Sequence, residues 1–228
     1  DLAYMIFKAY LQINKDTKQF IDTNVYNAWC GFEALSVPTE TFTYKDLVAG
    51  NVPITRGSVV VGGIATVQHA VKRFGFQSPE NFDYPEPLRS FLGREVYIST
   101  IAQVHALCVD DKIPHPVFIK PVTGHKDFNG HVISCFRDLI RTAGWLHQSP
   151  DTKVWVSEIR DFISEYRYFV NRGSVIGVGH YKGNPLVVPD TTKVQQAVDA
   201  WEDAPVSYTL DFGVTKEGST LLVEVNDG

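Results

Sequence analysis

The fold is decided by the stretch 206-VSYTLDFGVTKEGSTLLVEVN-226. Apolar and polar residues alternate on both sides of Lys216-Glu217-Gly218, which predicts two antiparallel strands joined by a turn. Period two places Glu224 and Asn226 on one face of the second strand. If the strands pair through the turn, Asp211 lies across from them, and three oxygen ligands suited to Mg²⁺ converge. The alternative is a solvent-facing acidic stripe on an edge hairpin.

Two lysines precede this hairpin in a context that favours phosphate binding. Lys120 ends a short apolar strand expected over residues 116–121, and Lys126 lies in the glycine-bearing loop 123–130. A lysine that leaves a buried strand is costly to place without an anion. Together with backbone amides of the loop, the two side chains would form a phosphate clamp. A structural lysine paired with a neighbouring carboxylate is the alternative.

A third group of residues has the character of a nucleoside site. The strand expected over residues 154–158 ends in an open linker, whose backbone could bind the edge of a purine. Glu165, seven residues after Glu158, could accept hydrogen bonds from both ribose hydroxyls. Arg167 shares the face of Glu165 and suits a phosphate or a carboxylate. An ion pair between Arg167 and Glu165 is the alternative.

The rest of the chain predicts two domains, residues 1–84 and 85–228, because the proline-rich stretch 78–87 reads as a linker. The first domain is expected to be a small α/β unit, with strands over 4–11, 40–44 and 59–63 and helices over 25–35 and up to residue 74. In the second domain, the segments 88–92 and 98–107 are expected to be helical or mixed, 131–136 a strand, 136–143 a helix, and 165–170 with 174–178 a hairpin. The polar stretch that contains His180, Tyr181, Lys182 and Lys193 is expected to be a solvated loop, and the alternative is that it faces the substrate.

Composition excludes several functional classes. The chain has 228 residues and a formal net charge of -5, which disfavours duplex nucleic acid as a partner. No apolar run approaches the roughly 18 to 20 residues that span a bilayer, so a cytoplasmic protein without a membrane partner is expected. The three cysteines contain no CxxC pair and indicate neither a disulfide framework nor a zinc site. Oligomeric state has no readable signal.

Taken in order, these motifs resemble the ATP-grasp superfamily over about residues 84–228. The resemblance rests on Ile119-Lys120-Pro121, the glycine-bearing loop, Glu158 with Glu165, and Asp211 thirteen residues before Glu224-Val225-Asn226. More narrowly, the chain is similar to a clade of bacteria and phages that is named for two arginines and a lysine. The resemblance implies α/β and α+β structure: an ATP-grasp fold, in which two α+β subdomains clamp ATP, preceded by a small α/β pre-ATP-grasp domain.

The resemblance also implies roles for individual residues. Lys120 would bind the α and β phosphates, and Lys126 with its loop, including Gly130, would cover the β and γ phosphates. The adenine would be bordered by Ser157, Glu158, Ile159 and Asp161, and the ribose bound by Glu165. Asp211, Glu224 and Asn226 would bind Mg²⁺. Lys126, Arg167 and Arg94 are the expected catalytic residues: Arg167 faces the γ phosphate or the acceptor, and Arg94 stands for a lysine that relatives usually supply upstream.

The activity implied is ATP-dependent joining of a carboxylate to an amine through an acyl phosphate, with release of ADP and phosphate. The substrates would be small-molecule or peptide carboxylates and amines. Two alternatives stay open: a phospho- or nucleotidyl-transferase on the same fold, and an ATP-binding regulatory module without turnover. The sequence contains no GxSxG elbow and no Walker A motif, which leaves acyl hydrolases and P-loop enzymes without support.

Overall fold

The chain divides into two compact units, Asp1–Pro79 and Glu80–Gly228. The structure is a computed structural model that describes residues 7–76, 82–108, 112–122, 130–142 and 149–227. The division expected after residue 84 comes a few residues earlier, because Tyr84 packs into the hydrophobic core of the second unit. Each unit is built around cores of its own.

The first unit is a parallel sheet in which each strand is followed by a helix. The sheet has the order β2-β1-β3, and its strands are β1 (Lys8–Gln12), β2 (Thr39–Phe42) and β3 (Ser58–Val61). The helices are α1 (Thr23–Ala34), α2 (Tyr44–Val48) and α3 (Ile64–Arg73). Its core includes Tyr10, Phe42 and Leu47. The expected α/β unit is confirmed, and its identity as a pre-ATP-grasp domain stays a prediction.

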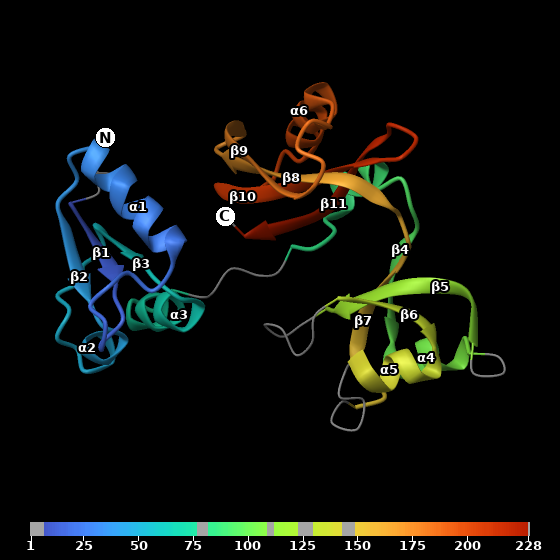
Figure 1. Ribbon diagram of the computed structural model, residues 1–228, viewed down its shortest axis with the longest axis horizontal. Helices are drawn as coiled ribbons and strands as arrows, with labels where there is room; N and C mark the ends of the chain where they lie inside the picture. Colours follow the sequence, from blue (N-terminus) through green and yellow to red (C-terminus); the bar gives the residue numbers. More distant parts are fainter. Residues whose placement is uncertain (1–6, 77–81, 109–111, 123–129, 143–148, 228) are drawn as a thin grey trace. The chain divides into compact units, whose positions relative to one another are not determined.

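The second unit contains a larger antiparallel sheet of order β11-β10-β8-β9. Its strands are β8 (Phe162–Asn171), β9 (Ser174–Gly183), β10 (Ser207–Thr215) and β11 (Thr220–Asp227). Helix α6 (Thr191–Ala200) covers one face of this sheet (Figure 1). Val194, Ala197 and Val198 of the helix join Leu210 and Phe212 of β10 in one core, so the other face of β10 is left for polar side chains.

A smaller antiparallel sheet of order β4-β7-β5-β6 completes the second unit. It consists of β4 (Val96–Thr100), β5 (Lys112–Pro121), β6 (His131–Cys135) and β7 (Lys153–Glu158). Helices α4 (Ile101–Ala106) and α5 (Phe136–Thr142) pack on it around Ile119, Ile133 and Leu139. The short 3₁₀ helix η2 (Glu86–Phe91) belongs to the core of the larger sheet through Leu88.

The hairpin of β10 and β11 forms in the expected register. Asp211 pairs with Glu224 across β10 and β11, and Gly218 takes the left-handed conformation, φ 82°, that the turn requires.

One expectation for local structure was wrong in part. The polar stretch 180–193 is a loop only over residues 184–190, because β9 continues to Gly183 and carries His180, Tyr181 and Lys182, and α6 begins at Thr191 and carries Lys193. The segment 98–107 is mixed, as expected: it contains the end of β4 and then α4, since Thr100 forms a capping box with Gln103 and starts the helix there. None of the helices in the described residues is long and apolar enough to cross a membrane.

Candidate functional site

An ion pair with one buried partner anchors the site on the face of the larger sheet opposite α6. Asp211 is 1% exposed, and a carboxylate at that depth needs a charged partner to offset its lost hydration. Arg167, opposite it on β8, supplies a two-pronged contact with N–O distances of 2.8 and 2.7 Å. Burial raises the pKa of the Asp211 carboxyl even though Arg167 opposes the shift. The partner expected for Arg167 was a ligand or Glu165, and Asp211 was not foreseen.

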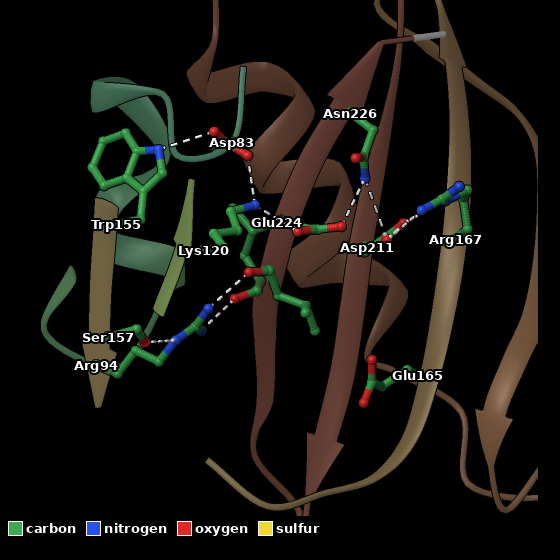
Figure 2. Close-up of polar contacts among 12 residues, drawn as sticks. Asp83, Arg94, Lys120, Trp155, Ser157, Glu165, Arg167, Asp211, Glu224 and Asn226 are labelled. Atoms are coloured by element: carbon green, nitrogen blue, oxygen red, sulfur yellow. Dashed lines mark hydrogen bonds and ion pairs between the residues drawn. The ribbon is translucent and has the colours of Figure 1, made fainter. Parts of the chain in front are cut away.

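Asn226 joins Asp211 to Glu224. Its Nδ2 lies 3.4 Å from an oxygen of Asp211 and 3.2 Å from Oε1 of Glu224 (Figure 2). The amide nitrogen therefore donates to one oxygen of Asp211 and one oxygen of Glu224. A cation bound between the two carboxylates would contact the same two oxygens. Turned over, the amide would present its own oxygen, completing a set of hard ligands that suits Mg²⁺. The described residues contain no group of three His, Cys, Asp or Glu residues that could hold a metal ion; in this cluster the third ligand would be an amide.

Lys120 reaches this cluster from the smaller sheet. Its Nζ lies 2.7 Å from Oε2 of Glu224 and 2.5 Å from Oδ1 of Asp83 (Figure 2), and 4.7 Å from the centre of the Tyr84 ring. Burial lowers the pKa of the ammonium, but Tyr84, Glu224 and Asp83 outweigh burial and raise it above its usual value. The pKa of Glu224 is lowered: burial opposes this, and Lys120 and Asn226 prevail. The lysine and this carboxylate are therefore both charged.

Glu165 is held on the same sheet by two residues that the sequence pattern placed in a polar loop, Tyr181 and Lys182. It is 5% exposed and accepts from the hydroxyl of Tyr181 at 2.8 Å and from Nζ of Lys182 at 2.5 Å. Burial, followed by Asp211 and Glu165, raises the pKa of Tyr181, so its hydroxyl is a donor. Both residues lie on β9, and a longer reading of the strand pattern through Gly183 would have found them.

Arg94 makes a different kind of contact from the one expected. Its Nε donates to Oγ of Ser157 at 2.9 Å, and its terminal nitrogens donate to the carbonyls of Leu92, Leu222 and Val223 at 3.1, 2.7 and 2.7 Å. The side chain thereby ties β7 to β11 (Figure 2). These contacts are structural, and a contact of Arg94 with phosphate stays a prediction.

The other expected nucleotide residues lie on the smaller sheet or on the connection to β8. Glu158 is exposed and accepts from the backbone N of Glu95 at 3.2 Å. Asp161 is exposed and lies 3.9 Å from Nζ of Lys216, while Ile159 is partly buried. A side chain at Gly130 would meet the Phe118 ring at 2.2 Å, so a larger residue there would require the ring to move. Lys126 lies outside the described residues.

Comparison with known proteins identifies the architecture. A family model for an ATP-grasp domain, family 2 of the clade named for two arginines and a lysine, matches residues 91–228. The D-alanine–D-alanine ligase of Bacillus anthracis, solved with ATP, superposes with a TM-score of 0.56 at 16% identity, covering 96% of this chain and 85% of its own. The N5-carboxyaminoimidazole synthetase of Staphylococcus aureus gives 0.55 at 8% identity, covering 98% and 71%. No curated protein sequence matches significantly. At these identities the structural likenesses show the fold.

Proposed function

Because the chain belongs to this two-arginine, one-lysine clade of ATP-grasp proteins, we propose that it is an ATP-dependent carboxylate-amine ligase. One observation carries the proposal: Lys120 of the smaller sheet meets Glu224 of the larger sheet at 2.7 Å, beside Asn226 and Asp211. A cation and a set of hard oxygen ligands are thus brought face to face by residues 104 positions apart in the sequence. Such a pairing suits a polyphosphate with a divalent metal.

Individual residues are assigned to the parts of the nucleotide as follows. Lys120 would contact the α and β phosphates, Lys126 and the loop ending at Gly130 the β and γ phosphates, and Glu165 the ribose. The adenine would border Ser157, Glu158, Ile159 and Asp161. Asp211, Glu224 and Asn226 would hold Mg²⁺, which when bound spreads the charge of the β and γ phosphates. Structures of this fold are known with ATP and with ADP, in keeping with this assignment.

The proposed reaction has two steps. A substrate carboxylate oxygen attacks the γ phosphorus, the bond to the bridging oxygen breaks, and ADP leaves with an acyl phosphate formed. An amine then attacks the acyl carbon, and the carbon–oxygen bond breaks to release phosphate and the amide. Arg167, whose side chain is 39% exposed, would orient the carboxylate while Asp211 holds its guanidinium. Arg94 would contribute indirectly, by holding Ser157 and strand β11 in position through its hydrogen bonds to them.

The substrates proposed are small-molecule or peptide carboxylates and amines, and the compartment proposed is the cytoplasm. The cytoplasm would supply the ATP that the proposed reaction consumes. The sequence contains no disulfide framework of the kind that oxidising compartments favour.

The proposal is tested by measuring ATP turnover with Mg²⁺ over pools of amino acids and peptides, with ADP and AMP resolved. We expect acceptor-dependent ADP and phosphate, lost in Lys120→Ala and in Glu224→Ala. Two exposed residues provide matched controls that should keep activity: Lys153→Ala on β7 and Glu217→Ala in the hairpin turn. AMP as product would indicate a nucleotidyl-transferase, and tight binding without turnover on any pool would indicate a regulatory module.

A further inference from the structure

Asp83 lies before the segment that the family model matches, which begins at residue 91, yet it is part of the site. The residue is 3% exposed and has a left-handed backbone, φ 44°, which Asp tolerates better than most residues. Its carbonyl accepts a hydrogen bond from the backbone N of Val225 at 2.9 Å. Val225 stands between Glu224 and Asn226, so the backbone fastens Asp83 to the strand that carries the proposed metal ligands.

The side chain of Asp83 is fixed by two donors on different oxygens. Oδ1 lies 2.5 Å from Nζ of Lys120, and Oδ2 accepts from the indole Nε1 of Trp155 at 2.9 Å (Figure 2). The Tyr84 ring packs edge-to-face against Trp155, with 5.1 Å between centroids, and lies under the ammonium of Lys120. This shell orients the carboxylate toward the lysine.

Lys120 divides its ammonium between Asp83 and Glu224. A metal bound by Glu224 would draw that carboxylate away from the lysine, since both cations compete for its oxygens. The ion pair between Asp83 and Lys120 would remain with or without the metal, because Trp155 orients the Asp83 carboxylate independently of Glu224. The ammonium has three donors, so it can stay on Asp83 and still donate to a phosphate.

We propose that Asp83 is a positioning residue that holds Lys120 in place for the nucleotide phosphates. The inference rests on the proposed function, because it assigns Lys120 to those phosphates. Without Asp83, Glu224 would be the described carboxylate that still pairs with the ammonium, and Lys120 would compete with the metal for it. Asp83 therefore acts on nucleotide affinity through Lys120.

The test is a double-mutant cycle on the full chain, with MgADP binding measured by isothermal titration calorimetry for the wild type, Asp83→Asn, Lys120→Ala and the double variant. Asn keeps the size of the side chain and removes its charge. We expect Asp83→Asn to weaken MgADP binding about tenfold with Lys120 present, and by less than about twofold in the Lys120→Ala background. A merely structural role for Asp83 would give the same loss in both backgrounds.

Trp155→Phe is the second variant, because it removes the indole donor and keeps a ring against Tyr84. Trp155→Phe should weaken MgADP binding less than Asp83→Asn does, and only when Lys120 is present. If a thermal melt shows that Asp83→Asn does not fold, Trp155→Phe tests the positioning role in its place. Wild-type affinity in both variants, or equal losses in the two backgrounds, would overturn the role of Asp83 alone. If the wild type itself binds no MgADP, the proposed function fails together with this inference.

Discussion

Asp211 combines deep burial with two polar partners, and this combination leads to a prediction about magnesium. The change Asp211→Asn removes the charge that Arg167 contacts and that the proposed metal would share, while keeping the shape of the side chain. We expect the wild type to bind ADP at least about tenfold more tightly with Mg²⁺ than with a chelator, and the variant to lose most of that difference. The measurement is ADP titration in both buffers. An equal magnesium effect in the two proteins would remove Asp211 from the metal site.

Glu165 leads to a prediction about the sugar. If its carboxylate accepts from the ribose hydroxyls, the wild type should bind ADP about tenfold more tightly than 2′-deoxy-ADP. The change Glu165→Ala should bring the two affinities together, and Glu217→Ala, on the exposed turn of the same sheet, should leave them apart. Competition binding with the two nucleotides provides the comparison. Discrimination that survives in Glu165→Ala would place the ribose elsewhere.

At the level of single residues, the sequence spacing predicted which side chains lie together where those residues belong to one hairpin. Asp211, Glu224 and Asn226 could be predicted because a tight turn sets their register. Asp83 could not, since its contacts with Lys120 and Trp155 depend on a connecting segment without any periodic pattern. Tyr181 and Lys182 were misread because Gly179 interrupts the apolar alternation, so the strand was expected to end at residue 178.

Among the elements, β7 and β11 are joined by Arg94. The change Arg94→Lys keeps one charge but cannot serve Ser157 and the carbonyls of Leu222 and Val223 together. We expect the free energy of unfolding to fall by about 2 to 3 kcal/mol, because buried acceptors lose their donors. Urea denaturation measures this, with the exposed Arg137→Lys on α5 as control. Unchanged stability with weakened ADP binding would favour a phosphate contact for Arg94 instead.

Helix α5 leads to a prediction about pH. The carboxylate of Asp138 accepts from the backbone N of Ser134 at 2.8 Å and of Cys135 at 3.1 Å. The Ser134 bond, more than the contacts with Cys135 and Arg141, lowers the pKa of Asp138 below its ordinary value of 3.8. A lowered pKa in the folded state means that this stabilisation is complete above pH 3.8 and is lost as the pH falls through the folded value.

The change Asp138→Asn should therefore cost up to about 1 kcal/mol of unfolding free energy near neutral pH, and the difference from the wild type should shrink in acid. Urea denaturation at a series of pH values measures both quantities. Asp151→Asn, at an exposed aspartate, serves as the control. A difference that does not change with pH would show that the carboxylate charge is not the cause.

The elements themselves could be predicted where periodicity is unbroken. The hairpin of β10 and β11 and the helices α1, α3 and α5 were confirmed, and the strand expected over residues 116–121 is the second half of β5. Helix α6 was missed because its apolar positions, Val194, Ala197 and Val198, are few and follow a turn-like Pro-Asp pair. The three positions are apolar because they pack on the face of the larger sheet. That packing is a long-range contact, which a local sequence pattern does not reveal.

For the whole molecule, the described contacts of the candidate site come from the second unit, whose two sheets meet at Lys120 and Glu224. The family match from residue 91 to 228 covers both sheets, whereas Asp83 and Tyr84 add contacts from just before it. The fold therefore accounts for the pairing of a cation with an acidic cluster. The acceptor depends on side chains that vary on such a fold, which is why sequence pattern could not name it.

The central claim is that the chain forms an amide through an acyl phosphate, and oxygen transfer tests it most directly. The full chain is incubated with ATP, Mg²⁺, an amine and the active carboxylate from the pool screen, labelled with ¹⁸O on both oxygens. Mass spectrometry should find one ¹⁸O in the inorganic phosphate for each ADP formed, because the carboxylate oxygen that attacked phosphorus leaves with it. Unlabelled phosphate, or label found in AMP, would contradict the account.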